Sequence, residues 1–169
     1  MLLSFQEKNP RIDSSAFIVE SSAIIGDVVI GAESSIWFNA VIRGDVNYIS
    51  IGKRTNIQDG CVLHVSRKSY PLIIGDEVTV GHNATLHACT IESRCLIGMG
   101  AIGMDGSIIG ENCIIGAGSL VTPNTTIQPG CLVIGSPAKV KRKLTDNEIR
   151  SILDSACHYV NDIKSYLYQ

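Results

Sequence analysis

Aliphatic residues recur at about every sixth position over most of the chain. The series starts at Ile18, Ile24 and Ile30 and, with short insertions, continues to Val133. A small residue follows four positions after most of the aliphatic ones, as Ser34 follows Ile30. A period of six fits neither an amphipathic helix, which repeats about every 3.6 residues, nor an alternating strand. It is typical of a triangular coil in which each hexad forms one side with its aliphatic residue inward, and three hexads make one turn.

This repeat predicts an all-β fold, a parallel β-helix over residues 1–140. Adjacent turns would stack about 4.8 Å apart and pair through their backbones. The pattern resembles that of other hexapeptide-repeat proteins, whose coils are left-handed in spite of the general right-handed crossover preference. We therefore expect a left-handed parallel β-helix of hexapeptide repeats.

A C-terminal α-helix is predicted within residues 141–169 and is expected to pack on the same domain. Thr145 and Glu148 form a capping box. Apolar residues then recur every three or four positions, at Ile149, Ile152, Leu153, Ala156, Val160, Ile163 and Leu167. Such a stripe docks on a hydrophobic surface, here either the last exposed turn of the coil or a groove along its side.

Composition and charge narrow the classes of partner. Aromatic residues make up only 5% of the chain, so aliphatic and small side chains must fill the core. A net charge of −2 without a long Lys/Arg run argues against nucleic acid or an acidic membrane as partner. Residues 1–8 do not read as a signal peptide, and no segment is apolar for long enough to span a bilayer. We expect a cytoplasmic protein that binds small molecules or other proteins.

Six cysteines are expected to be reduced in that compartment. Cys95, Cys113 and Cys131 are spaced by 18 residues, which is one full turn. They should form a column of small buried core residues without a redox role.

Three histidines fall in the interrupted middle of the repeat. Leu63 and Leu86 are 23 residues apart, one turn plus a five-residue insertion, so His64 and His87 should stack on adjacent turns. His82 belongs to a different side of the coil, and a single chain cannot easily bring all three together. A homotrimer of parallel coils can. Three imidazoles with an open fourth position suit a catalytic Zn²⁺ site, and Fe²⁺ or Co²⁺ would also fit.

Further motifs share this region of the chain. They are Arg43-Gly44-Asp45, Asn56-Ile57-Gln58-Asp59-Gly60 and Gly81-His82. Together with His64 and His87 they resemble the gamma-class carbonic anhydrases, and the match covers nearly the whole chain.

The resemblance implies a metal bound by His64 and His87 of one subunit and His82 of the next. It also implies reversible hydration of carbon dioxide to bicarbonate by a metal-bound hydroxide, with Gln58 hydrogen-bonded near the metal-bound water. Arg43 and Asp45 are implied to form an ion-pair arrangement across the trimer interface; otherwise they would be a surface pair of little energetic weight.

The repeat itself supports part of this arrangement. If the step from Ile42 to Ile51 is a hexad with three extra residues, Arg43 stacks one turn below His64.

Three more residues are candidates through the resemblance. Asn56 and Asp59 correspond to family positions around the same pocket, but each could instead be a turn residue. Tyr159 resembles a pocket tyrosine of some relatives and could equally serve helix packing.

The segment Ser66 to Tyr70 lacks the glutamate of the acidic loop that carries protons in the archetype, so the route of proton transfer is open. The intrinsic pKa of His158 suits a proton carrier, but this residue could instead be an ordinary surface residue.

Two other functions remain: an acyl-CoA-dependent acyltransferase or thioesterase with a single histidine as base, and a non-catalytic metal-binding or scaffold relative.

Overall fold

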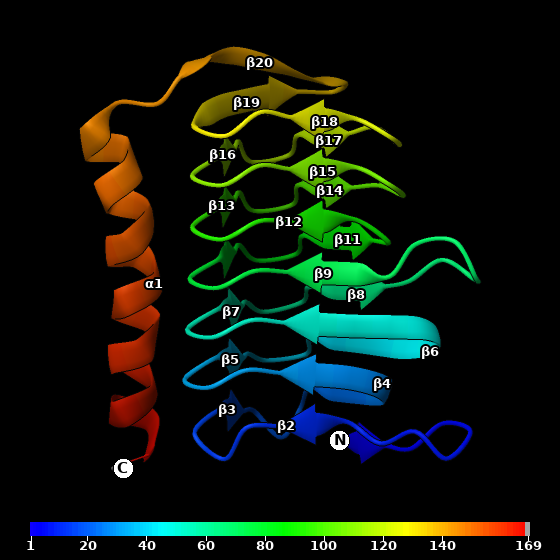
Figure 1. Ribbon diagram of the computed structural model, residues 1–169. Helices are drawn as coiled ribbons and strands as arrows, with labels where there is room; N and C mark the ends of the chain where they lie inside the picture. Colours follow the sequence, from blue (N-terminus) through cyan, green and yellow to red (C-terminus); the bar gives the residue numbers. More distant parts are fainter. Residues whose placement is uncertain (168–169) are drawn as a thin grey trace.

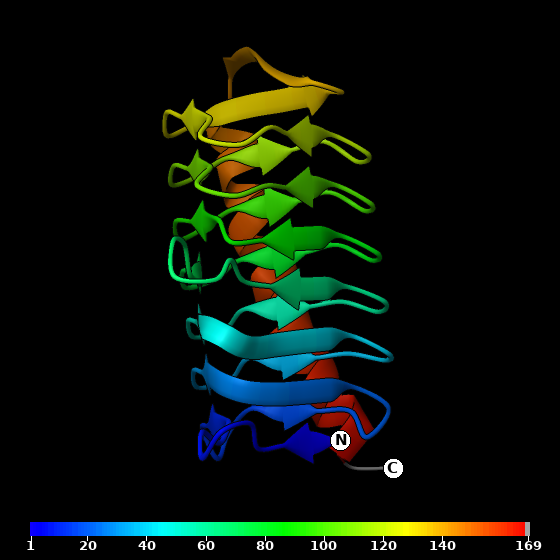
Figure 2. The ribbon, with the colours of Figure 1, turned by 90° about the vertical axis from the view of Figure 1, so that its right-hand side faces the viewer.

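The chain winds into a stack of triangular turns, and one long helix lies along the outside of the stack (Figures 1 and 2). The computed structural model describes residues 1–167. Almost all strand pairs are parallel and join one turn to the next, as Val80 pairs with Ile57 before it and with Ile97 after it. The predicted left-handed parallel β-helix is confirmed.

We call the three sides of the coil A, B and C. Side A contains β3 (Phe17–Ile18), β5 (Ser35–Ile36), β7 (Asn56–Ile57), β10 (Thr79–Val80), β13 (Leu96–Ile97), β16 (Ile114–Ile115) and β19 (Cys131–Gly135). Side B contains β8 (Val62–His64), β11 (Thr85–His87), β14 (Ile102–Gly103) and β17 (Leu120–Val121). Side C contains β9 (Leu72–Ile74), β12 (Thr90–Ile91), β15 (Ile108–Ile109) and β18 (Thr126–Ile127).

Two long strands, β4 (Ala23–Ile30) and β6 (Val41–Ile51), contribute to both side B and side C. The first part of β6 pairs with β8, and its last part pairs with β9. At the N-terminal end of the coil, β1 (Leu2–Leu3) and β2 (Arg11–Ile12) pair with β4. At the other end, β20 (Ala138–Lys143) pairs antiparallel with β19 and so runs past the boundary predicted at residue 140.

The hexad pattern has a simple physical basis. Its aliphatic residues point inward and form one continuous core, in which Ile42, Ile57 and Val80 are fully buried. At the corners between sides A and B the chain turns through left-handed residues, which are Gly60 and Asn83 on successive turns, with φ of 69° and 59°. Glycine and asparagine adopt this conformation at the lowest cost.

The cysteine column is also present. Cys95, Cys113 and Cys131 are buried in the core, and the backbone N–H of Cys131 lies 3.4 Å from the Sγ of Cys113. All six cysteines, which lie within residues 1–167, are free thiols. Burial raises the pKa of Cys95 to about 12, so this thiol stays protonated at neutral pH.

The predicted helix is α1 (Asp146–Leu167), and its capping box has formed. The N–H of Thr145 donates to Glu148 Oε2 at 2.8 Å, and the N–H of Glu148 donates to Thr145 Oγ1 at 3.3 Å. The apolar stripe docks on side A, with Ile152 and Ala156 fully buried. The helix therefore runs along a side of the coil, while β20 covers the last turn (Figure 1). The side chain of Leu167, the last member of the predicted stripe, lies outside the described residues.

None of the helical residues described forms a segment long and apolar enough to cross a bilayer.

Candidate metal centre

His64 and His87 stack on side B, as the repeat predicted. The two residues are direct partners in the pairing of β8 with β11. Their side chains point the same way from adjacent turns, and His64 Nδ1 lies 3.2 Å from His87 Nε2.

Each of these rings is held by an aspartate on its other nitrogen. His64 Nε2 lies 3.0 Å from Asp45 Oδ1, and His87 Nδ1 lies 2.5 Å from Asp105 Oδ1. Burial tends to raise the pKa of both carboxyl groups. The hydrogen bonds from the histidines, together with that from Arg43 to Asp45 and that from Ser66 to Asp105, outweigh burial and hold each pKa below its usual value. An ionised carboxylate only accepts, so the ring nitrogen that faces it carries the hydrogen.

The two remaining nitrogens therefore face each other with lone pairs. This contact is repulsive between neutral rings unless a proton or a metal ion lies between them. Two nitrogen ligands of a tetrahedral zinc ion, each about 2.05 Å from the metal, are about 3.3 Å apart. The separation of 3.2 Å between His64 Nδ1 and His87 Nε2 fits such an ion. The aspartates occupy the positions of the outer partners that orient metal-bound histidines.

Arg43 lies one turn below His64 in the same column, which confirms the position given by the repeat. Its guanidinium forms an ion pair with Asp45 within the same chain. Asp45 thus links Arg43 to His64 and fixes the orientation of the ring. Whether this pair also meets a neighbouring subunit stays a prediction.

His82 lies at the corner between sides A and B, away from the other two histidines. It follows β10, which belongs to side A. His82 lies in the turn before β11, whereas His87 is the last residue of that strand. Within residues 1–167 of one chain, no group of three or more His, Cys, Asp or Glu side chains is placed to hold a metal ion.

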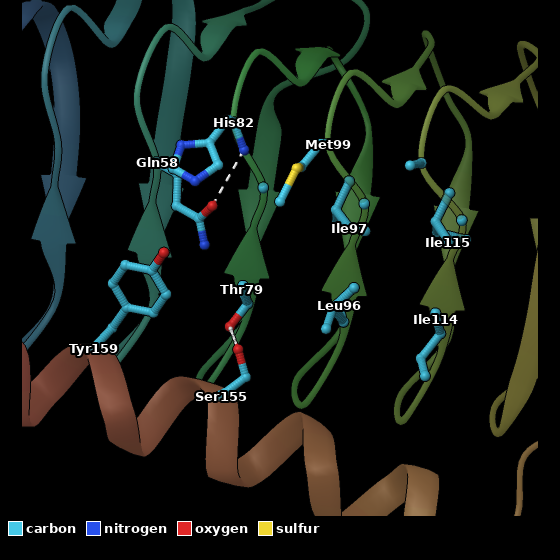
Figure 3. Close-up of a pocket in the computed structure, with 14 residues that line it drawn as sticks. Gln58, Thr79, His82, Leu96, Ile97, Met99, Ile114, Ile115, Ser155 and Tyr159 are labelled. Carbon is cyan, nitrogen blue, oxygen red and sulfur yellow. Dashed lines mark hydrogen bonds between the residues drawn. The ribbon is translucent and has the colours of Figure 1, made fainter.

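His82 nevertheless has the same arrangement as the stacked pair. Its Nδ1 lies 2.7 Å from Asp59 Oδ2, which leaves the other ring nitrogen available as a ligand. Its backbone N–H donates to Gln58 Oε1 at 3.2 Å (Figure 3). All three candidate ligands thus have an aspartate partner.

A chain of buried hydrogen bonds fixes Gln58. Because the His82 N–H can only donate, the Gln58 oxygen faces it and the Gln58 nitrogen donates to Asn56 Oδ1 at 3.1 Å. Asn56 Nδ2 then donates to Thr79 Oγ1 at 2.9 Å, and Thr79 Oγ1 lies 3.1 Å from Ser155 Oγ on α1. The helix is therefore connected to the candidate site through this chain, whose last link, between Thr79 and Ser155, is drawn in Figure 3.

A cavity of about 450 Å³ opens beside this chain, between side A and α1 (Figure 3). Gln58, His82 and Tyr159 line its polar end, and Leu96 and Met99 contribute to its apolar wall. Burial and the nearby charges of Asp59 and Asp162 raise the pKa of Tyr159.

Tyr159 also packs edge-on against Trp37, with ring centroids 5.5 Å apart, so it lines the cavity and packs the helix at the same time. His158, on the same helix, is exposed.

Three residues of this region were not identified from the sequence: Thr79, Ser155 and Asp105. Asp105 is 18 residues after His87, one full turn, so the spacing of the repeat contained a signal for it. Thr79 and Ser155 meet only because α1 docks on side A, and no local pattern indicates that contact.

Comparison with known proteins agrees with the fold and with the motifs. The model of the family described as "Bacterial transferase hexapeptide (six repeats)" matches residues 88–123. The protein named "Carbonic anhydrase" from Geobacillus kaustophilus is 51% identical over 166 residues, which cover 98% of this chain and 91% of that protein. "Gamma carbonic anhydrase 1, mitochondrial" from Arabidopsis thaliana is 47% identical over 95% of this chain. This chain belongs to the gamma-class carbonic anhydrase-like family.

Two further facts qualify this membership of the gamma-class family. The chain spans about 60% of the length of the Arabidopsis relative. A crystal structure from Bacillus cereus, 50% identical with a TM-score of 0.96, covers 98% of this chain and 96% of its own and is described as that of a candidate acetyltransferase. The family and the fold are therefore shown, while two different reactions are attached to close relatives.

Proposed function

We propose that this protein catalyses the reversible hydration of carbon dioxide to bicarbonate at a divalent metal site shared between subunits of a homotrimer. The observation that carries the proposal is the pair of facing nitrogens on His64 and His87, 3.2 Å apart and each opposite an aspartate-bound nitrogen. The gamma-class carbonic anhydrases among the relatives support the choice of reaction.

In this proposal His64, His87 and His82 of the partner subunit hold the metal. Zn²⁺ suits three imidazoles best, and Fe²⁺ or Co²⁺ are acceptable by ligand type. When bound, such a metal would lower the pKa of a coordinated water to about 7 and would so supply hydroxide at neutral pH. The three aspartates keep the ring nitrogens in the required tautomer and orientation.

Other residues of the chain would bind and orient the substrate. The Gln58 amide is fixed through its oxygen and one hydrogen, and its second N–H is free to donate to an oxygen of the substrate in the cavity. Leu96 and Met99 offer an apolar wall to the nonpolar carbon dioxide. Asn56 and Tyr159 act in positioning, Asn56 through Gln58 and Tyr159 at the rim.

Acyl transfer or thioester hydrolysis is the second candidate, favoured by the description of the Bacillus cereus relative. His82, oriented by Asp59 at 2.7 Å and facing the cavity, has the geometry of a general base for that reaction. This mechanism needs no metal. A non-catalytic relative would show neither activity.

Stopped-flow hydration of carbon dioxide and acyl-CoA turnover, each measured on metal-loaded and metal-stripped protein, distinguish these functions. Because the segment Ser66 to Tyr70 offers no glutamate as proton carrier, we expect slow hydration that increases with imidazole buffer concentration and rises with pH through about 7. Acyl-CoA turnover that survives metal removal, without hydration above background, would overturn the proposal.

A further inference from the structure

A second cavity, of about 410 Å³, lies between the coil and the C-terminal half of α1. Four aromatic rings and two carboxylates dominate its lining: Trp37, Phe38, Tyr159, Tyr166, Asp59 and Asp162. Tyr159 also lines the cavity beside Gln58, so the two cavities adjoin at this ring. Asp59 and Tyr159 also belong to the site described above, whereas the other lining residues have no part in the proposed reaction.

Two of the rings, those of Tyr159 and Tyr166, pack edge-on against the ring of Trp37. Trp37 is only 5% exposed and lies at the base of the cavity. Tyr159 stands at 76° to it with centroids 5.5 Å apart, and Tyr166 stands at 80° with centroids 5.2 Å apart. The two tyrosines are seven residues apart on α1, about 10 Å along the helix axis. All three rings line the cavity, and a cation is attracted to an aromatic ring when it lies within about 6 Å of the ring centroid.

The charges at this cavity are negative. Asp59 and Asp162 both line it, and among the described residues that line it none is lysine or arginine. Asp59 Oδ2 already lies 2.7 Å from His82 Nδ1. Asp162 lies on α1, between Tyr159 and Tyr166 in the sequence. Burial is the largest cause of the raised pKa of Tyr159, and the charges of both carboxylates add to it.

We propose that this cavity binds a small organic cation whose head is a methylated or quaternary ammonium group. Aromatic faces attract such a weakly hydrated cation, and the carboxylates supply the opposite charge. A small metal ion such as Ca²⁺ or Mg²⁺ would bind to oxygen ligands, and the aromatic rings would add little to its binding. A neutral apolar group would gain nothing from the two carboxylates.

Trp37 is the single tryptophan of the chain and lines this cavity, so its fluorescence reports on binding there. We expect choline and tetramethylammonium to change the fluorescence saturably, in metal-free as in metal-loaded protein. The neutral analogue of choline, in which carbon replaces the ammonium nitrogen, should bind at least about tenfold more weakly, because it lacks the charge. Calorimetric titration of the same samples detects binding that leaves the fluorescence unchanged.

Variants test the two parts of the site. Asp162→Asn and Tyr166→Leu should each weaken choline binding about three- to tenfold. The matched control Asp154→Asn removes a charge from an exposed position on the same helix, outside the cavity, and should leave binding unchanged. Thermal unfolding of each variant shows whether α1 is still docked. Equal affinity for the neutral analogue, wild-type affinity in both folded variants, or no binding by either method would overturn the proposal.

Discussion

The buried hydrogen-bond chain from Gln58 to α1 makes Thr79 a test of how the candidate site is positioned. Thr79→Val keeps the shape of the side chain but leaves Asn56 Nδ2 without its acceptor at 2.9 Å. Because Thr79 is only 4% exposed, water cannot easily replace the hydroxyl. We expect a loss of about 1–3 kcal/mol in the free energy of unfolding. We also expect slower carbon dioxide hydration at unchanged metal content, because Asn56, which accepts a hydrogen bond from Gln58, is then held less firmly.

The control for this prediction is Thr79→Ser, which retains the hydroxyl and should recover most of both effects. Urea unfolding, metal analysis and stopped-flow rates measure the three quantities. Equal behaviour of the valine and serine variants would mean that the hydroxyl does not position Gln58.

At the residue scale, the sequence predicted where residues lie in the coil better than it predicted which side chains they contact. Counting hexads and insertions was enough to place Arg43, His64 and His87 in one column, because strand register in a coil follows directly from spacing. The contact between Thr79 and Ser155 could not be found this way, because it joins residues that are far apart in the chain and meet only after docking.

At the scale of elements, α1 was predicted in its limits and in its buried face, but its docking side was left open. The capping box and the 3.6-residue period are local signals, so Thr145 and Ile152 were identified from sequence alone. Which surface of the coil receives the helix depends on the chain segment between β19 and Thr145. That segment forms β20, whose pairing with β19 no repeat pattern predicted.

The cap of α1 gives a pH-dependent prediction. Hydrogen bonds from Arg142 and Thr145 lower the pKa of Glu148 to about 2, from an ordinary value of 4.5. A carboxylate with a lowered pKa stabilises the folded state above its unfolded pKa, and this contribution is lost as pH falls through about 2. Hydrogen exchange of the first-turn amides of α1 should therefore be slower in wild type than in Glu148→Gln at pH 7, and the difference should shrink between pH 4.5 and pH 2.

Asp154→Asn, at an exposed position on the same helix, serves as the control and should show no such pH-dependent difference in the first turn. A gap between wild type and Glu148→Gln that stays constant down to pH 2 would contradict an ionised Glu148 as the source of the stabilisation.

At the scale of the whole molecule, side B offers a surface for a second copy of the chain. It has His82 at the corner where its strands begin and His64 and His87 where they end. Between these ends Val62 and Ile102 point outward and are 43% and 40% exposed. A partner subunit that covers such an apolar surface would also bring its own ligands to these ends. The sequence could predict that His82 lies apart from His64 and His87. It could not predict the assembly, because the repeat gives the register of strands within one chain and not the contacts between chains.

Mixed trimers test the shared site directly. His82→Ala and His87→Ala each remove one ligand from every site of their own homotrimer, so each variant alone should bind little metal. In trimers co-expressed from both variants in equal amounts, about one site in four combines an intact His64–His87 pair with an intact His82 of the partner subunit. Metal content of the mixed trimers should therefore recover to about a quarter of the wild-type value. His158→Ala, at an exposed position on α1, should retain full metal content, and light scattering should give the mass of a trimer throughout. If the co-expressed variants bind no more metal than each does alone, or if a monomer retains the metal, His82 does not act from a neighbouring copy.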